Sequence, residues 1–347
     1  MKNFKKTLAL LAALALSATA LYGCGPAAGG DSKPAAGNDA GNSATEDSKA
    51  EESTADGGET AANGDQLTIL CWNANDSQPM VDLFCEKTGT DPSLINIKNF
   101  NVQGGQASEQ YTQYLANADN DADIMFLEAD WCLNFINDDA QTLPLSELGY
   151  SDSDFSDIYD YVVETGKSTT TGALKGISWQ AAAGGFCYRD DLAEQYLGVK
   201  TPDEMQAKVK DWDTFLATAK ALKDANGPAL SATLGGVWQV YSGSRGSAWV
   251  KDGKLVVDDY CTKYAEFAHT LYNNEYVTKV SQWTPEWTPL GQTDDVMGFF
   301  VSTWGFGDTI LTAAAGGEGG ATFGKWKCVV GPSPFYWGGT WLAPAAR

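Results

Sequence analysis

The segment from residue 67 to residue 127 constrains the fold most, because strand and helix patterns alternate along it. Runs of apolar and strand-forming residues predict strands at 67–72, 95–102 and 124–127. Between them, apolar residues recur at helical spacing from Gln78 and again from Ser108. Strands that are separated by helices form a parallel sheet, and ligands bind at the carboxyl ends of such strands. We therefore predict an α/β fold with a binding edge that includes Glu128, Asp130 and Trp131.

The stretch 174–192 is predicted to connect this first α/β half to a second one. Its middle is made of Ala and Gly, which are too small to fill a core, and Trp179 and Gln180 stand just before them. Small residues let the backbone approach another body closely, so we expect a cleft here. An ordinary strand–loop–strand connection inside one domain is the alternative.

The second half contains firmer signals for single elements. Thr201-Pro202-Asp203-Glu204 is a capping box with Pro in the first helical position, which predicts a helix start. A hairpin is expected to turn at Asp252-Gly253. Further strands are predicted at 297–301, 327–330 and 336–342. No helix follows to cover the last one, so we expect the fold to be incomplete at the C-terminus.

The N-terminus predicts export and anchoring. Three lysines precede an apolar run at 8–21, which is typical of a signal peptide (1–23). Leu21-Tyr22-Gly23-Cys24 resembles the lipobox of bacterial lipoproteins, in which the cysteine carries the lipid and becomes the mature N-terminus. Residues 24–65 then form a predicted disordered acidic tether, because 25–65 lacks every large apolar residue. A soluble secreted protein is the alternative.

Charge and cysteine usage exclude several partners. The net charge is −22, with 45 acidic against 23 basic side chains, which argues against nucleic acid and against an anionic membrane surface. Six cysteines remain after Cys24, without regular spacing, and free thiols are favoured over disulfides. His269 is the only histidine, and no cysteine pair has metal-ligand spacing, so neither a metal nor a cofactor is expected.

Several short motifs, taken in order, resemble the extracellular solute-binding proteins of bacterial ABC importers, of the carbohydrate-type, maltose-binding-protein-like family. These are Asp-Ile-Met-Phe-Leu-Glu-Ala-Asp-Trp (123–131), Gly-Ile-Ser-Trp-Gln (176–180), Trp-Asp (212–213), Gly-Phe-Phe-Val-Ser-Thr-Trp-Gly (298–305) and Trp-Gly-Gly-Thr-Trp (337–341). The resemblance implies a two-lobed periplasmic-binding-protein-like fold of type II. It also implies lobe 1 at 66–177, lobe 2 at 178–333, a return into lobe 1 at 334–347, and a closing helical region beyond.

The resemblance also implies a function without catalysis. A membrane-anchored, monomeric binding component would capture a sugar or oligosaccharide by hinge closure and deliver it to the ABC permease subunits. Sugar rings stack their C–H faces on aromatic planes, and their hydroxyls require paired donors and acceptors. The expected ligand-binding residues are Trp72, Trp131, Trp179, Trp283, Trp287, Trp304 and Trp337 with Glu128, Asp130, Gln180 and Arg189.

Two other functions stay open from the sequence. A polyamine or amino-acid binding protein on the same fold would also suit an acidic, aromatic cleft, because aromatic faces attract cations. A secreted glycoside hydrolase would need a specific pair of carboxylates, and the chain offers many acids but no recognisable pairing.

Overall fold

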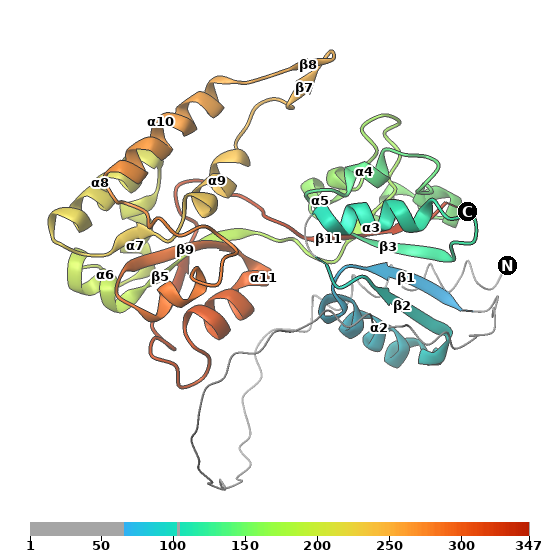
Figure 1. The fold of residues 1–347 in the computed structure, drawn as a ribbon, viewed down its shortest axis with the longest axis horizontal. Helices are drawn as coiled ribbons and strands as arrows, with labels where there is room; N and C mark the ends of the chain where they lie inside the picture. The colour runs from blue at the N-terminus through green and yellow to red at the C-terminus, as the bar shows by residue number, and fades with distance from the viewer. Residues whose placement is uncertain (1–65, 103–104, 347) are drawn as a thin grey trace, which may run out of the picture.

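The computed structural model describes residues 66–102 and 105–346, which form two bodies joined by two chain segments (Figure 1). We call the body built on the first sheet lobe 1 and the body built on the second sheet lobe 2. The predicted signal peptide, Cys24 and the tether lie outside the described residues. Among the helices of the described residues, none has the length and apolar character that a membrane span requires.

Lobe 1 contains a five-stranded sheet in the order β2-β1-β3-β11-β4. Its strands are β1 (Leu67–Cys71), β2 (Ile95–Asn99), β3 (Ala122–Glu128), β4 (Ile177–Ser178) and β11 (Thr340–Pro344). The first three pair in parallel, as the alternating pattern predicts. β11 returns from the far end of the chain and lies antiparallel between β3 and β4. This order and the mixed α/β composition confirm the predicted fold class.

Helices cover both faces of this sheet. Successive residues of a strand point to opposite faces, so alternate residues pack against different helices. Ile124 and Phe126 pack in the cluster that contains Phe84 of α2, and Met125 and Leu127 pack in the cluster that contains Tyr111 of α3. The helical segments of lobe 1 are α2 (Ala74–Thr88), η1 (Pro92–Leu94), α3 (Gly105–Leu115), α4 (Leu133–Ile136), η2 (Leu145–Leu148), η3 (Asp152–Phe155) and α5 (Asp160–Thr165).

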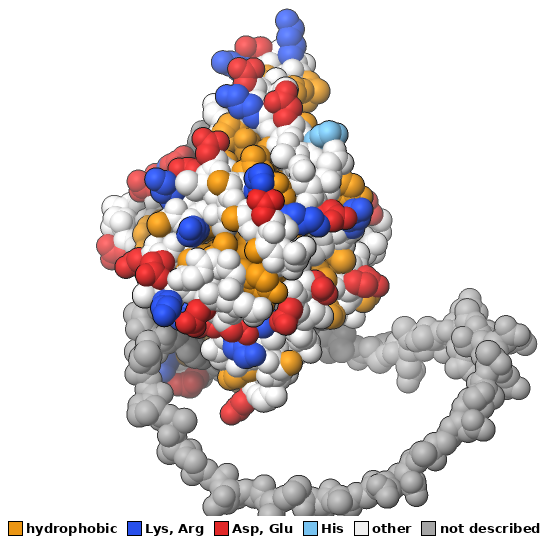
Figure 2. All heavy atoms as spheres, turned by 90° about the vertical axis from the view of Figure 1, so that its left-hand side faces the viewer, with side chains coloured by type: hydrophobic (Ala, Val, Ile, Leu, Met, Phe, Trp, Pro, Cys, Tyr) orange, Lys and Arg blue, Asp and Glu red, His pale blue; other side chains and the backbone are white. Residues whose placement is uncertain are grey.

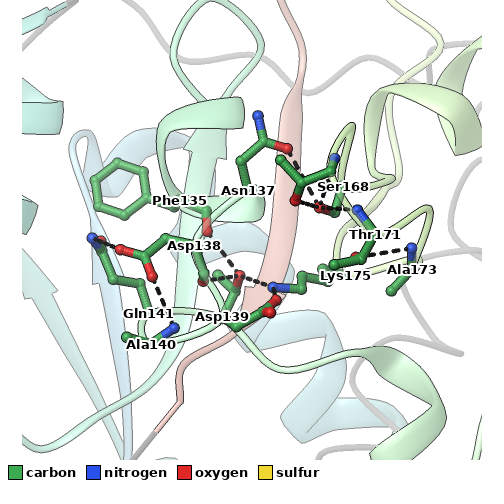
Figure 3. A network of polar contacts seen from close by, with 12 residues as sticks. Phe135, Asn137, Asp138, Asp139, Ala140, Gln141, Ser168, Thr171, Ala173 and Lys175 are labelled. Atoms are coloured by element: carbon green, nitrogen blue, oxygen red, sulfur yellow. Dashed lines mark hydrogen bonds and ion pairs between the residues drawn. The ribbon is translucent and has the colours of Figure 1, made fainter.

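A buried lysine anchors the loops of lobe 1 that precede the exit of the chain towards lobe 2 (Figure 3). The Lys175 side chain is fully buried, and its Nζ lies 2.6 Å from Asp139 Oδ1 and 3.3 Å from Thr142 Oγ1. Beside it, Asn137 Oδ1 accepts a hydrogen bond of 2.8 Å from the backbone N–H of Thr169. These contacts hold the loop that follows α4 against the segment that enters β4.

Lobe 2 contains a four-stranded sheet in the order β10-β5-β9-β6. Its strands are β5 (Gly184–Arg189), β6 (Ala229–Ser231), β9 (Val296–Ser302) and β10 (Trp326–Val329). β5 is antiparallel to both β9 and β10, whereas β6 runs parallel to β9. A small hairpin of β7 (Val250–Lys251) and β8 (Lys254–Leu255) projects at the top of Figure 1 and turns at Asp252-Gly253 as predicted.

The helical segments of lobe 2 pack around this sheet (Figure 1). They are α6 (Asp190–Leu197), α7 (Pro202–Val209), α8 (Trp212–Asp224), α9 (Leu234–Ser242), α10 (Asp259–Asn273), η4 (Thr288–Gln292), α11 (Thr303–Gly305) and the π-helical segment η5 (Phe306–Ala314). The predicted capping box is formed, because Thr201 Oγ1 accepts from the N–H of Glu204. Figure 2 shows acidic side chains spread over the face of lobe 2, with basic ones between them.

The predicted last strand, 336–342, is wrong in extent. Tyr336 forms an isolated bridge with Ala183, whereas β11 begins only at Thr340. Between Tyr336 and Thr340, Gly338 adopts a φ of +69° and Gly339 a φ of +109°. Positive φ breaks an extended strand, so the chain bends where it passes from one lobe to the other.

Candidate functional site

Two segments connect the lobes and run side by side. The first crossing segment comprises residues 179–183 and the second comprises residues 330–339. Trp337 N donates to Ala182 O at 3.0 Å, and Gly184 N donates to Phe335 O at 2.8 Å. Gln180 Oε1 accepts from Thr340 N at 2.9 Å. The side chain of Gln180 thus ties the first crossing segment to the start of β11.

Side chains of both lobes meet at Gly338. A Cβ atom at this position would lie 3.1 Å from Trp304 Nε1 of lobe 2 and 3.6 Å from Glu128 Oε1 of lobe 1. Glu128 is the last residue of β3, and Trp304 lies two residues after the end of β9. The carboxyl ends of a strand from each lobe therefore converge on the second crossing segment, which is where an α/β sheet places a ligand.

The lobe 1 side of this place is acidic. The backbone N–H of Asp130 donates to Glu128 Oε2 at 2.9 Å. Burial, aided by the charge of Asp130, raises the pKa of Glu128 from 4.5 to about 7. Desolvation also raises the pKa of Asp130, although its side chain keeps contact with solvent. Near neutral pH, Glu128 can consequently both donate and accept hydrogen bonds.

The lobe 2 side is a cluster of tryptophans. Trp283 stacks on Trp304 with ring centroids 5.9 Å apart and planes 24° apart, and both contact Trp337 edge-on. Trp304 Nε1 and Ser302 Oγ both donate to Trp337 O, at 2.7 and 2.9 Å. Trp337 is buried, whereas Trp283 is 61% exposed. The cluster thus presents one large aromatic face to solvent, held by rings beneath it.

A hollow of about 600 Å³ adjoins the first crossing segment. Trp179 and Gln180 line it together with Tyr159 and neighbouring residues of the loop before α5. Tyr161 stacks between Tyr159 and Tyr336, with centroid distances of 5.9 and 5.0 Å. The sequence analysis did not include these tyrosines. For Tyr159 and Tyr161, the only signal was their place at the end of an acidic segment that precedes the connecting stretch in the chain.

Three of the predicted aromatic residues lie deeper in the lobes. Trp131 is 5% exposed and packs edge-on against Tyr111 and Phe135, and Trp72 packs edge-on against Trp131. Trp287 is 3% exposed in the core of lobe 2. Trp131 and Trp287 therefore offer no exposed ring face in this conformation, and Trp72 is half-buried.

Arg189 lies at the opposite end of β5 from the crossing segment, about 16 Å along the strand. Its guanidinium is buried, pairs with both oxygens of Asp191 at 2.7 and 2.8 Å, and contacts Asp294 at 3.1 Å. Its Nη1 also donates a hydrogen bond to Thr293 O at 3.1 Å. The structure thus gives Arg189 a role inside lobe 2 and does not bring it to the other predicted site residues.

Within residues 66–102 and 105–346, no group of three or more His, Cys, Asp or Glu side chains could hold a metal ion.

A family model described as bacterial extracellular solute-binding protein matches residues 80–347. The chain belongs to this family. No curated protein matches this extracellular solute-binding protein.

Solved structures of other binding proteins share the fold. An extracellular solute-binding protein of family 1 has a TM-score of 0.69 at 18% identity, over 81% of this chain and 70% of that one. The galacto-N-biose-/lacto-N-biose I-binding protein of the ABC transporter from Bifidobacterium longum, in complex with lacto-N-biose, has a TM-score of 0.60 at 17% identity, over 82% and 71%. The ABC transporter associated binding protein from B. animalis subsp. lactis, in complex with β-1,6-galactobiose, has a TM-score of 0.57 at 19% identity, over 82% and 68%.

Proposed function

We propose that this extracellular solute-binding protein captures a sugar or oligosaccharide between its two lobes and delivers it to an ABC permease. The observation that carries the proposal is the meeting of Glu128 with the Trp283–Trp304–Trp337 cluster at Gly338. An exposed aromatic face suits the C–H face of a sugar ring, and adjacent carboxylates suit its hydroxyls. Binding proteins of this fold that are solved with lacto-N-biose and β-1,6-galactobiose support the ligand class.

In this proposal, the chain binds by hinge closure. The two crossing segments are the only connections between the lobes within the described residues, so rotation about them changes the separation of Asp130 and Trp283. A ligand that contacts both lobes binds the closed state more tightly and shifts the population towards it. Selectivity then follows from hydroxyl pairing, because a buried partner left without its hydrogen bond lowers the affinity.

The remaining expectations are part of the same proposal. The expected division is lobe 1 at 66–177, lobe 2 at 178–333 and a return to lobe 1 at 334–347, and these boundaries fall at β4 and within the second crossing segment. A lipid on Cys24 and the tether at 24–65 hold a monomer at the extracellular face of the cell membrane. Two acyl chains on one cysteine suffice for stable anchoring.

A thermal-shift and calorimetry screen tests the ligand class. The panel contains β-linked galacto-disaccharides, α-linked gluco-oligosaccharides, polyamines and free amino acids. We expect a sugar to raise the melting temperature with concentration, because only the folded state binds it. Binding of polyamines or amino acids alone would refute the sugar proposal, and release of shorter sugars from an oligosaccharide would show an enzyme instead.

A cation-binding function is the second candidate, and one observation favours it. Asp130 lies beside Glu128 at the place where lobe 1 meets the tryptophan cluster. Carboxylates next to aromatic faces attract ammonium groups as well as hydroxyls. Salt dependence separates the two, since a bound polyamine loses affinity steeply as ionic strength rises and a neutral sugar does not.

A further inference from the structure

Two cysteines face each other across neighbouring strands of lobe 2. Cys187 lies in β5, and its register partner in the antiparallel strand β10 is Cys328. Side chains in register on adjacent antiparallel strands point to the same face of the sheet. The two thiols accordingly form a hydrogen-bonded pair.

The hydrogen-bond alternation of the sheet shows which kind of pair this is. Asp190 N donates to Lys325 O at 2.9 Å, so these residues form a hydrogen-bonded pair three positions from the cysteines. Because the pairs alternate, Cys187 and Cys328 form a non-hydrogen-bonded pair. Such pairs have Cα atoms about 4.5 Å apart, inside the range of about 4.4–6.8 Å that disulfides use.

Gly185 provides the room for the second sulfur. It lies two residues before Cys187 and on the same face of β5. A Cβ atom on Gly185 would lie only 2.5 Å from Cys328 Sγ, so a larger residue would displace that sulfur. The absence of a side chain at 185 lets the Cys328 thiol lie over β5.

The two thiols differ in access and in acidity. Cys187 is 4% exposed, whereas Cys328 is exposed on β10, the edge strand of the sheet. The hydrogen bond from Cys187 lowers the pKa of the Cys328 thiol, and the same contact together with burial raises the pKa of Cys187. An external reagent therefore reaches Cys328 first, and Cys328 is also the better nucleophile.

We propose that Cys187 and Cys328 are a redox-active pair that closes into a cross-strand disulfide in the exported protein. The oxidant is a disulfide, supplied by an extracytoplasmic thiol–disulfide oxidoreductase or a small-molecule disulfide. The Cys328 thiolate attacks it to form a mixed disulfide and releases one thiol. The Cys187 sulfur then attacks Cys328 Sγ, loses its proton, forms the Cys187–Cys328 bond and releases the second thiol. Two protein thiols are oxidised and one external disulfide is reduced to two thiols.

The bridge would secure the part of lobe 2 that holds both crossing segments. β5 begins where the first crossing segment ends, and β10 ends where the second begins. The bridge also closes a loop of about 140 residues, and long loops gain the most from a crosslink that restricts the unfolded chain. The six described cysteines are free thiols in the structure, as the sequence predicts, and the proposed disulfide is the oxidised form of this one pair.

Thiol mapping of the full-length folded protein tests the bond. The protein is equilibrated with oxidised glutathione, denatured, alkylated and digested for mass spectrometry. We expect one linked pair of peptides, which contain Cys187 and Cys328, and alkylated Cys71, Cys85, Cys132 and Cys261. Alkylation of all six cysteines after Cys24, or a link between any other two of them, would overturn the proposal.

Single variants test the order of the two steps. Cys187→Ser is expected to accumulate a glutathione adduct at Cys328, because the resolving thiol is gone. Cys328→Ser is expected to stay unmodified at Cys187, which is buried. The oxidised wild-type protein should also melt at a higher temperature than the reduced one, and this difference should vanish in the double variant but persist in Cys261→Ser. Equal modification of both single variants would refute the assigned roles.

Discussion

At the scale of single residues, Glu128 is the group whose environment departs most clearly from that of an ordinary surface acid. Its pKa rises from 4.5 to about 7 because burial disfavours the charged form and Asp130 adds a nearby negative charge. The folded state therefore binds a proton more tightly than the unfolded state does. Stability from this group is fully present below about pH 4.5 and is lost as the pH rises through about 7.

We expect Glu128→Gln to remove this pH dependence. The free energy of unfolding of the wild-type protein should fall by up to about 3 kcal/mol between pH 4.5 and 7, and the variant should lack most of that fall. Urea titrations at several pH values measure it. Glu318→Gln, at an exposed acid of lobe 2, is the control and should keep the wild-type slope. Parallel slopes for wild type and Glu128→Gln would contradict the assignment.

Variants at Trp283 and Trp287 test ligand binding and core packing separately. Trp283→Ala removes an exposed ring, so stability should change little, whereas sugar affinity should fall about tenfold through loss of one stacking face. Trp287→Ala empties a buried site and should lower the free energy of unfolding by about 3–5 kcal/mol. Calorimetry and denaturant titration of both variants check this. An unchanged affinity in Trp283→Ala would remove Trp283 from the site.

The sequence indicated which residues could bind a ligand, but it did not show which of them are buried. Glu128 and Trp304 were expected at strand ends, and the structure brings them together at Gly338. Trp131 was expected at the same edge as Glu128, and Arg189 was expected to bind the ligand, yet Trp131 is sealed in an aromatic cluster and Arg189 is saturated by Asp191 and Asp294. Local pattern cannot distinguish these cases, because burial depends on which distant segment packs against each strand end.

At the scale of elements, the backbone conformation of the second crossing segment requires a glycine at position 338. An alanine there would have to adopt a φ of +69°, and its Cβ would press against Trp304 Nε1 at 3.1 Å. We expect Gly338→Ala to lower stability by about 1–2 kcal/mol and also to weaken ligand binding. Gly198→Ala is the matched control, since its φ is +67° and nothing lies within 4 Å of the new Cβ. It should show the same strain without the loss of binding.

The second prediction at this scale concerns the ion pair between Lys175 and Asp139. Asp139→Asn leaves the buried ammonium without its charged partner, so the free energy of unfolding should fall by about 1.5–3 kcal/mol. Asp138→Asn changes the neighbouring carboxylate, which does not contact Lys175 and instead accepts from Gln141 and from the N–H of Ala140. Thermal melts should rank Asp139→Asn below Asp138→Asn. The reverse ranking would show that the pair contributes little.

The sequence pattern predicted most of the helices and strands, and the strand predicted at 336–342 is an exception with a physical cause. The parallel order of β1, β2 and β3, the capping box at Thr201 and the turn at Asp252 all arise from residues close in sequence. The split of the predicted strand at 336–342 does not, because Tyr336 pairs with Ala183 of the first crossing segment whereas the strand from Thr340 pairs with β3 of lobe 1. A continuous run of strand-forming residues carries no information about a change of partner.

At the scale of the whole molecule, two lobes with separate cores are joined through hydrogen-bonded crossing segments, which is the arrangement that the proposed hinge closure requires. Each lobe has its own sheet, and their hydrophobic clusters are separate. The sequence suggested this division through the family resemblance and through the small residues at 181–185, which cannot fill a core. In the proposed function, the angle between the lobes depends on ligand contacts, and no local pattern encodes it.

Closure on ligand binding is the prediction that belongs to this scale. Small-angle X-ray scattering of the full chain should show a smaller radius of gyration with a saturating sugar than without it, because the ligand binds the closed state more tightly. Trp283→Ala at the same sugar concentration should show a smaller change, in proportion to its lower occupancy. A sugar that raises the melting temperature but leaves the radius unchanged would mean that it binds to one lobe alone, and that the crossing segments do not act as a hinge.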